Sequence, residues 1–248
     1  MIVEYDGSNY FGFQLQASGA TIQGEIEGAL WKLTGERTRI VAASRTDTGV
    51  HAWGQVVSFR TSSSHSSLTF VNGLNYYLPK DIAVRAAYKV RDSFGVRHDA
   101  LSREYAYYIW NSPVRSPIRA DFSYHVRELL DVVAMNQACQ ALIGEHDFAS
   151  FASDLKPGLK TVRKVFRAEV AKDGELVIFT MIASSFLPHQ VRNTTGLLVR
   201  VGQGKAGIEE FHRVIEARKP GLAGPAAPPC GLCLVRVNYP HSFEEEKL

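Results

Sequence analysis

The sequence has no long apolar run, few cysteines and little net charge. Its longest apolar stretch, residues 176–183, is interrupted by Thr180 and is far shorter than the roughly 20 residues of a transmembrane helix. Three cysteines in 248 residues do not form a disulfide framework. The first residues have neither the basic nor the apolar region of a secretory signal. These absences predict a soluble cytoplasmic protein with no membrane partner.

The net charge of +3, from 28 basic and 25 acidic residues, is too small to identify a partner. The charge is unevenly distributed, however. Residues 37–60 contain four arginines and a single acid, and residues 156–167 contain five basic residues and no acid, while residues 244–246 form an acidic tail. Either basic run alone fits an ordinary solvated face. Two runs that flank one candidate site favour a phosphate-binding surface.

A content of 45% hydrophobic residues predicts a folded chain, with one large domain or two of about 120 residues. Strand and helix patterns are mixed without strict βαβ alternation, which indicates an α+β fold. The same kind of pattern starts again near residue 100, so we expect halves at residues 1–100 and 101–248. Predicted helices cover residues 21–35, 67–78, 128–143, 188–202 and 208–215. Predicted strands cover residues 2–5, 39–43, 55–59, 83–90, 105–110, 161–170, 175–183 and 232–239.

Residues 45–51, Arg-Thr-Asp-Thr-Gly-Val-His, place a carboxylate in a polar loop between two predicted strands. Taken alone, Asp-Thr-Gly is a weak motif, and Asp47 fits an Asx-turn in which its side chain bonds local backbone N–H groups. An aspartic peptidase would need two carboxylates that share a proton. No second Asp-Thr-Gly or Asp-Ser-Gly occurs, so that function would require a symmetric dimer.

The longer string resembles the active-site motif of the tRNA pseudouridine synthase A family. Further matches to that family follow in order along essentially the whole chain: residues 4–14, 54–59, 75–84, 103–107, 144–151, 186–193 and 231–232. Three residues depart from the usual pattern. Ser44 replaces a glycine, Thr48 replaces an alanine, and Glu104 replaces a basic residue.

The resemblance implies the pseudouridine synthase fold, in which two similar α/β halves share a mostly antiparallel sheet with helices on one side and a basic cleft on the other. It also implies an isomerase that forms pseudouridine at uridines 38–40 in the anticodon stem-loop of tRNA, and a homodimer with no other protein partner. The reaction breaks the N1–C1′ bond, turns the uracil and joins C5 to C1′. Because it involves neither a redox change nor a group donor, we expect no cofactor and no metal.

The resemblance identifies Asp47 as the catalytic residue. A carboxylate suits this chemistry because it can attack as a nucleophile or stabilise cationic character at C1′. Whether it first attacks C1′ or C6 of the base stays open. Arg192 matches the arginine that pairs with this carboxylate in the family. The residues alone also allow a surface arginine that binds phosphate, although the flanking Val191 and Leu198 favour burial.

Three further substrate-binding residues follow from the resemblance. Tyr105 matches the tyrosine whose ring holds the uracil, but alternation places Tyr107 on the same strand face, and spacing alone does not choose between them. Arg45 is expected to help extrude the target nucleotide or fill the gap that it leaves. Leu232 is expected to pack beside the base, with an ordinary core leucine as the alternative.

Other chemistry-bearing residues receive no functional role. Cys230 and Cys233 have Cys-x-x-Cys spacing, but no second cysteine pair accompanies them to make a zinc site. His51 and His146 are interpreted as structural. The alternative function is a non-catalytic RNA-binding module on the same fold. Such a module would not need Asp47 as well as an active-site tyrosine and arginine.

Overall fold

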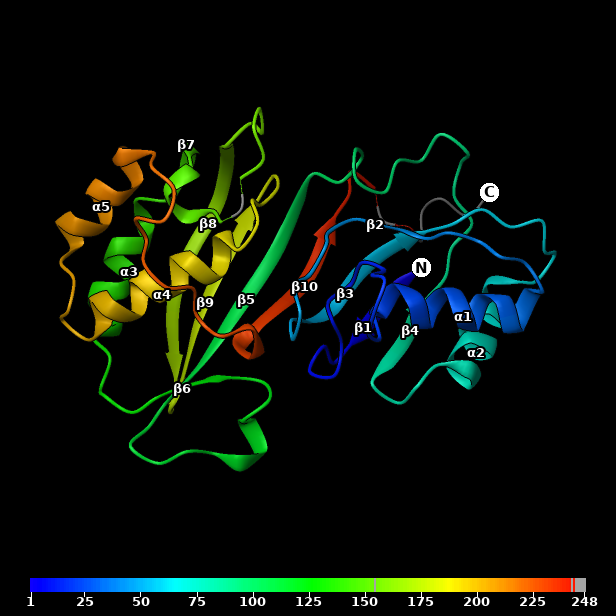
Figure 1. Ribbon diagram of the computed structural model, residues 1–248, viewed down its shortest axis with the longest axis horizontal. Coiled ribbons are helices and arrows are strands. Elements are labelled where there is room, and N and C mark those ends of the chain that lie inside the picture. The colour runs from blue at the N-terminus through cyan, green and yellow to red at the C-terminus, as the bar shows by residue number, and fades with distance from the viewer. Residues whose placement is uncertain (154, 242, 244–248) are drawn as a thin grey trace. The chain divides into compact units, whose positions relative to one another are not determined.

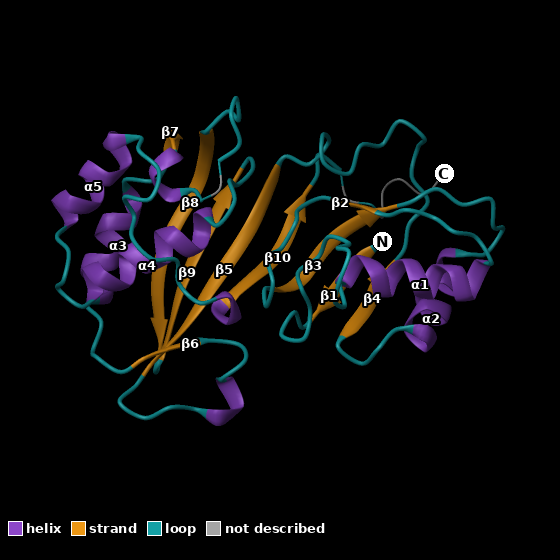
Figure 2. Ribbon diagram, viewed as in Figure 1, coloured by secondary structure: helices purple, strands orange, loops and turns teal. Residues whose placement is uncertain are grey.

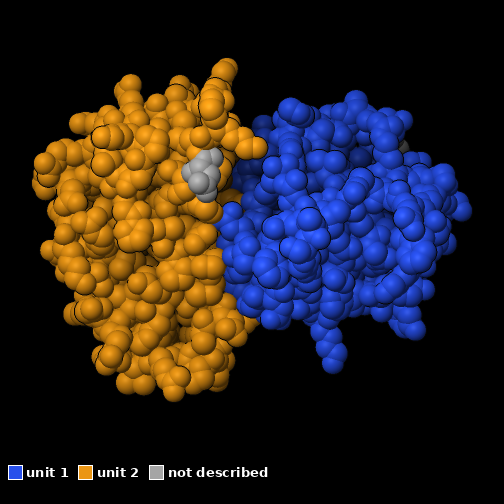
Figure 3. Space-filling model, in the orientation of Figure 1, with its two compact units in different colours: residues 1–103, 233–248 blue, residues 104–232 orange. Residues whose placement is uncertain are grey.

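The computed structural model describes residues 1–153, 155–241 and 243 (Figure 1). The chain forms two compact units, unit 1 with Met1–Arg103 and Cys233–Leu248, and unit 2 with Glu104–Leu232 (Figure 3). The last strand belongs to unit 1, where it pairs in parallel with a strand of that unit. The acidic residues 244–246 lie outside the described part of the chain.

The sheet of unit 1 has the strand order β4-β1-β3-β10. Its centre is β1 (Ile2–Tyr5), which pairs antiparallel with β3 (His51–Ser58) and with β4 (Ile82–Ala86). The short β2 (Val41–Ala42) is antiparallel to β3, and β10 (Leu232–Asn238) is parallel to it. Strand β3 therefore carries partners that come from both ends of the sequence.

Two helices cover one face of this sheet, α1 (Ile22–Thr34) and α2 (Ser67–Tyr77) (Figure 2). The hydroxyl of Thr21 accepts the Gly24 N–H and begins α1, which ends at Gly35 with φ of 76°. These ends are the predicted ones, because a hydroxyl N-cap and a left-handed glycine are strong local signals.

The sheet of unit 2 has the order β5-β9-β8-β7. Strands β8 (Val162–Asp173) and β9 (Leu176–Ala183) form the predicted antiparallel hairpin, and β7 (Gly144–Asp147) is antiparallel to β8. Strand β5 (Ser102–Asn111) lies beside β9 and pairs in parallel with the short β6 (Tyr124–Val126). Most strand pairs within the two units are antiparallel, and the mixture of these strands with helices confirms the expected α+β class.

Helices α3 (Val132–Gln140), α4 (Gln190–Gly202) and α5 (Ile208–Ala217) pack together on one face of unit 2 (Figure 2). Helix α3 is shorter than predicted at both ends. The side chain of Asp131 caps its start, and the helix ends at Gln140, before Gly144. Helix α4 begins two residues later than predicted. Short 3-10 helices occur at Pro117–Arg119, Ala149–Phe151 and Pro229–Gly231. No helix in the described residues is long and apolar enough to span a bilayer.

Candidate active site

Asp47 lies in a tight turn between β2 and β3. The N–H of Val50 donates to the carbonyl oxygen of Asp47 at 3.1 Å, and Gly49 has φ of 76°. This is the geometry of a type II turn, which requires a left-handed residue at its third position. Because the main chain closes the turn, the carboxylate of Asp47 is not needed for that purpose. The partly buried side chain is suited to a chemical role.

The N-terminal segment lies directly against this turn. The N–H of Phe13 donates to the carbonyl oxygen of Thr46 at 3.0 Å. Gly12 has φ of 84°, and a Cβ atom at this position would lie 2.9 Å from the Thr46 oxygen and 3.2 Å from the carbonyl carbon of Asp47. Gly7 approaches more closely still, because a Cβ atom there would lie 2.1 Å from the carbonyl oxygen of Val50. Two motifs far apart in sequence thus form one supported loop.

Side-chain hydrogen bonds fix the residues just before Asp47. The hydroxyl of Tyr5 and that of Thr46 lie 2.8 Å apart. The amide of the fully buried Gln55 donates to the carbonyl oxygen of Ser44 at 2.7 Å, and the Ser44 N–H donates to the Gln55 side-chain oxygen at 3.3 Å. These contacts use only the main chain of Ser44, which does not have a positive φ. Serine therefore replaces the family's glycine there without strain.

Arginines surround the strand that enters the loop. Arg45 is exposed to solvent. Sequence reasoning missed Arg97, whose Nε donates to the carbonyl oxygen of Ala42 at 2.9 Å. The buried Arg103 donates to the carbonyl oxygens of Ala43 at 3.2 Å and Arg97 at 2.9 Å. Burial and the charge of Arg45 lower the pKa of Arg97 from its ordinary value. No spacing signal in the sequence connects these residues.

The two tyrosines that sequence spacing could not separate are both buried but make different contacts. Tyr107 has no exposed surface, and its hydroxyl donates to the carbonyl oxygen of Pro228 at 2.6 Å. Its ring leaves no space beside Gly231, where a Cβ atom would lie 2.5 Å from the ring. The ring of Tyr105 packs edge-on against Phe186, with centroids 5.0 Å apart. Tyr107 is thus committed to packing, while the assignment of the also buried Tyr105 as the substrate-binding tyrosine rests on the family resemblance.

Arg192 is half-buried near the start of α4, in a less apolar setting than its neighbours suggested. Its Nε donates to the carbonyl oxygen of Ala227 at 2.9 Å, and the Ala227 N–H donates back to the Arg192 carbonyl oxygen at 3.0 Å. Leu232 is buried at the start of β10. The predicted residues thus form two groups, with Asp47 and Arg45 in unit 1 and the other three in unit 2.

The histidines and cysteines make structural contacts. The His51 ring nitrogen Nδ1 accepts the Gly7 N–H at 3.1 Å, and His146 Nε2 lies 3.0 Å from the carbonyl oxygen of Ile143. Burial raises the pKa of Cys233 to about 12, which disfavours the reactive thiolate. Across the described residues, no three or more His, Cys, Asp or Glu side chains gather as metal ligands would.

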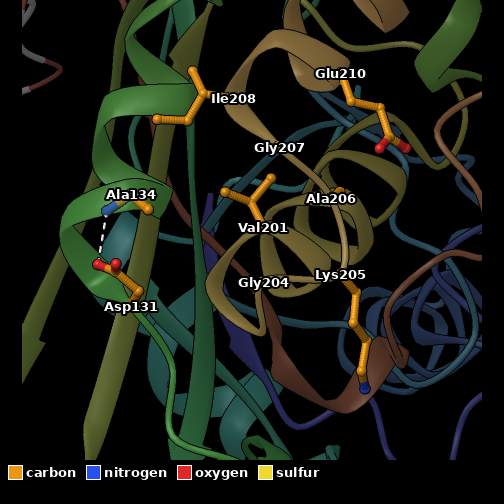
Figure 4. A pocket seen from close by; sticks show the side chains of 9 residues that line it. All are labelled: Asp131, Ala134, Val201, Gly204, Lys205, Ala206, Gly207, Ile208 and Glu210. Carbon is orange, nitrogen blue, oxygen red and sulfur yellow. Dashed lines mark hydrogen bonds between the residues drawn. The ribbon is translucent and has the colours of Figure 1, made fainter.

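An open depression of about 440 Å³ lies in unit 2, beside the N-termini of α3 and α5 (Figure 4). None of the predicted site residues lines it. Its polar side chains already have partners within the protein: Asp131 accepts the Ala134 N–H at 2.9 Å, and Glu210 pairs with Arg200 at 3.3 Å. The depression therefore offers little unsatisfied chemistry for a ligand.

Comparisons of the sequence with a family model and with curated proteins point to one family. Residues 1–99 and 138–240 match the family model described as tRNA pseudouridine synthase. Over 239 residues, the chain is 43% identical to a tRNA pseudouridine synthase A of Pelobacter propionicus, covering 96% of this chain and 98% of that protein. It is 44% identical over 237 residues to one of Moorella thermoacetica, covering 95% and 96%. A solved Cbf5-Nop10-Gar1 complex aligns with a TM-score of 0.37 and 12% identity, over 81% of this chain and 45% of that chain, a likeness too low to support an argument.

Proposed function

We propose a target and a nucleophile for this chain, which belongs to the tRNA pseudouridine synthase family. The target is uridines 38–40 of the tRNA anticodon stem-loop, and the nucleophile is Asp47. As a member of this family, the chain is an isomerase that forms pseudouridine in tRNA. The positions in tRNA and the residue roles are our proposal. The observation that carries the proposal is the rigid Asp47 turn, which is held by the N-terminal segment on one side and by Gln55 on the other.

The reaction needs a carboxylate in a fixed place. Asp47 attacks either C1′ of the ribose or C6 of the base, and the N1–C1′ bond breaks. After the uracil turns, C5 bonds to C1′ and the bond between Asp47 and the substrate breaks, which restores the carboxylate. The proton on C5 leaves and N1 gains a proton, so no atom is added to the product. Main-chain bonds at Ser44, Thr46 and Val50 support this role, because a preorganised nucleophile needs little reorganisation on the way to the transition state.

The remaining roles come from the family resemblance. The Tyr105 ring holds the detached uracil, and its edge-on contact with Phe186 supports a fixed ring orientation. Arg192 stabilises the ionised carboxylate of Asp47. Arg45 helps extrude the target nucleotide, and Leu232 packs beside the base. Basic residues in 37–60 and 156–167 contact phosphates along a basic cleft.

Tritium release tests the activity and the nucleophile together. The protein is incubated with tRNA that carries 5-tritiated uridine, and release of tritium reports loss of the C5 hydrogen. We expect wild-type release and a fall of at least about a thousandfold for Asp47→Asn, with tRNA binding retained. Asp92→Asn, at an exposed carboxylate in the same unit, is the matched control and should keep full activity.

Two outcomes would contradict the proposal. Absence of release by the wild-type protein from any tRNA would favour a non-catalytic RNA-binding module. Near wild-type turnover by Asp47→Asn would show that another residue is the nucleophile. Carbodiimide mapping of the product then locates pseudouridine, and modification outside positions 38–40 would refute the proposed target.

We also propose that the protein acts in the cytoplasm, as a homodimer without other protein partners. Both statements follow from the family resemblance and the composition. Light scattering at several protein concentrations measures the oligomeric state. A mass of one chain at every concentration would contradict the dimer.

A further inference from the structure

Two arginines of unit 1, Arg45 itself and Arg97 through its bond to Ala42, lie along the short stretch of residues 42–45, and the charge of Arg45 helps to lower the pKa of Arg97. Arg45 and Arg97 are both exposed, and among the described residues neither forms an ion pair. The carboxylate nearest to Arg97 in sequence, Asp99, is already engaged by Arg91 at 3.3 Å. Like charges without a counter-charge repel each other, so this pairing is unfavourable in the empty protein. An anionic ligand would remove the repulsion.

The position of Arg97 is built into the fold. Its Nε donates to the carbonyl oxygen of Ala42, three residues before Arg45. Its own carbonyl oxygen accepts a hydrogen bond from the buried guanidinium of Arg103 at 2.9 Å, and Arg103 also bonds Ala43. Both the backbone and the side chain of Arg97 are thereby tied to the strand that leads to the Asp47 turn. The Nε contact leaves the two terminal nitrogens of Arg97 for a ligand.

We infer that Arg97 and Arg45 together form a binding site for one phosphodiester of the substrate RNA, next to the nucleotide that reacts at Asp47. A guanidinium presents a planar set of donors that matches phosphate oxygens, and two such groups neutralise one phosphate well. The site rests on the proposed function in one respect only, namely that the bound polyanion is tRNA. Its role is to fix the RNA backbone beside the turn, and Arg97 touches no reacting atom.

The affinity for tRNA at different salt concentrations tests this site. Each phosphate contact contributes about 0.7–0.9 to the slope of log affinity against log salt. We expect Arg97→Gln to reduce the slope by about that amount and to weaken binding about 10-fold at low salt. In the tritium assay, KM should rise by more than kcat falls. The Arg45→Gln, Arg97→Gln double variant should lose less affinity than the two single variants predict together, because both side chains bind one phosphate.

Arg91→Gln is the matched control. It removes one positive charge from the same loop, but from a side chain that already pairs with Asp99. We expect its salt slope and its activity to match those of the wild type. An unchanged slope for Arg97→Gln, or an equal loss of slope for Arg91→Gln, would overturn the site. Additive losses in the double variant would also overturn it.

Folding and function are separated by two further measurements. If thermal unfolding shows that Arg97→Gln is not folded, Arg97→Lys replaces it. The lysine keeps the charge and loses the planar fork, so we expect a wild-type salt slope with weaker binding, and wild-type affinity would overturn the site. Absence of tritium release by the wild-type protein would refute the proposed function. The slope of log affinity against log salt tests the phosphate site independently of turnover.

Discussion

The close approach of Gly12 to the Asp47 turn allows a sharp test of how the proposed nucleophile is positioned. In Gly12→Ala, the new methyl group would lie 2.9 Å from the Thr46 oxygen and 3.2 Å from the Asp47 carbonyl carbon. The turn must therefore move by a few tenths of an ångström. The positive φ of 84° adds strain of about 1–2 kcal/mol for an L-residue. Because a misplacement of about 1 Å can cost about 100-fold in rate, we expect kcat to fall roughly 10-fold.

Gly35→Ala is the control that separates strain from displacement. Gly35 also has a left-handed φ, 76°, but a Cβ atom there would meet nothing within 4 Å. It should therefore lose about the same 1–2 kcal/mol of stability while keeping its kcat. Each kcal/mol corresponds to about 2–4 °C in Tm for a chain of this size, so calorimetry verifies the stability part. Equal kcat values for the two variants would refute the idea that the N-terminal segment positions Asp47.

Three further predictions concern unit 2 and the buried thiols. Tyr105→Phe should keep tRNA binding and Tyr105→Leu should sharply reduce turnover in the tritium assay, whereas equal activity of both would remove the stacking role. Tyr107→Phe loses the bond to Pro228 and should lower the free energy of unfolding in urea by about 1–3 kcal/mol with kcat unchanged, and a large loss of kcat would show that the Tyr107 hydroxyl does more than support packing. Burial raises the pKa of Cys139 to about 11 and of Cys233 to about 12, above the unfolded value of 9.0, so the unfolded chain releases these protons first. The free energy of unfolding should therefore fall as pH rises above about 9, and a double cysteine-to-alanine variant with the same pH slope would contradict this origin.

The parts of the fold that were predictable are those with local signals. Thr21 and Gly35 marked the ends of α1, and Gly174 marked the hairpin between β8 and β9. Strand β3 begins four residues earlier than predicted, because the exposed Trp53 and the following Gly54 interrupt the alternating pattern. A Cβ atom at Gly54 would lie 2.5 Å from the carbonyl oxygen of Val235. The close approach of the neighbouring strand β10 therefore requires glycine at this position.

The candidate site shows the same division. The motif identified the Asp47 loop. The structure shows which residues hold it: Gly12, which is distant in sequence, and Gln55, which lies on the following strand. Arg97 was not predictable, because its relation to Arg45 passes through the carbonyl oxygen of Ala42 and leaves no mark in sequence spacing. The contact that separates the surroundings of the two tyrosines was not predictable either, because Tyr107 bonds Pro228, 121 residues further along the chain.

The origin of β10 has a consequence for synthesis on the ribosome. Unit 2 is one continuous segment and can fold as soon as it has emerged. Unit 1 must wait, because β3, which follows directly after the Asp47 turn, receives its parallel neighbour only with the strand that begins at Leu232. At about 5–20 residues per second, that delay lasts on the order of ten seconds or more. During this interval the part of β3 that pairs with β10, at His51 and Ala52, lacks its partner, and unit 1 becomes complete only once β10 has been made.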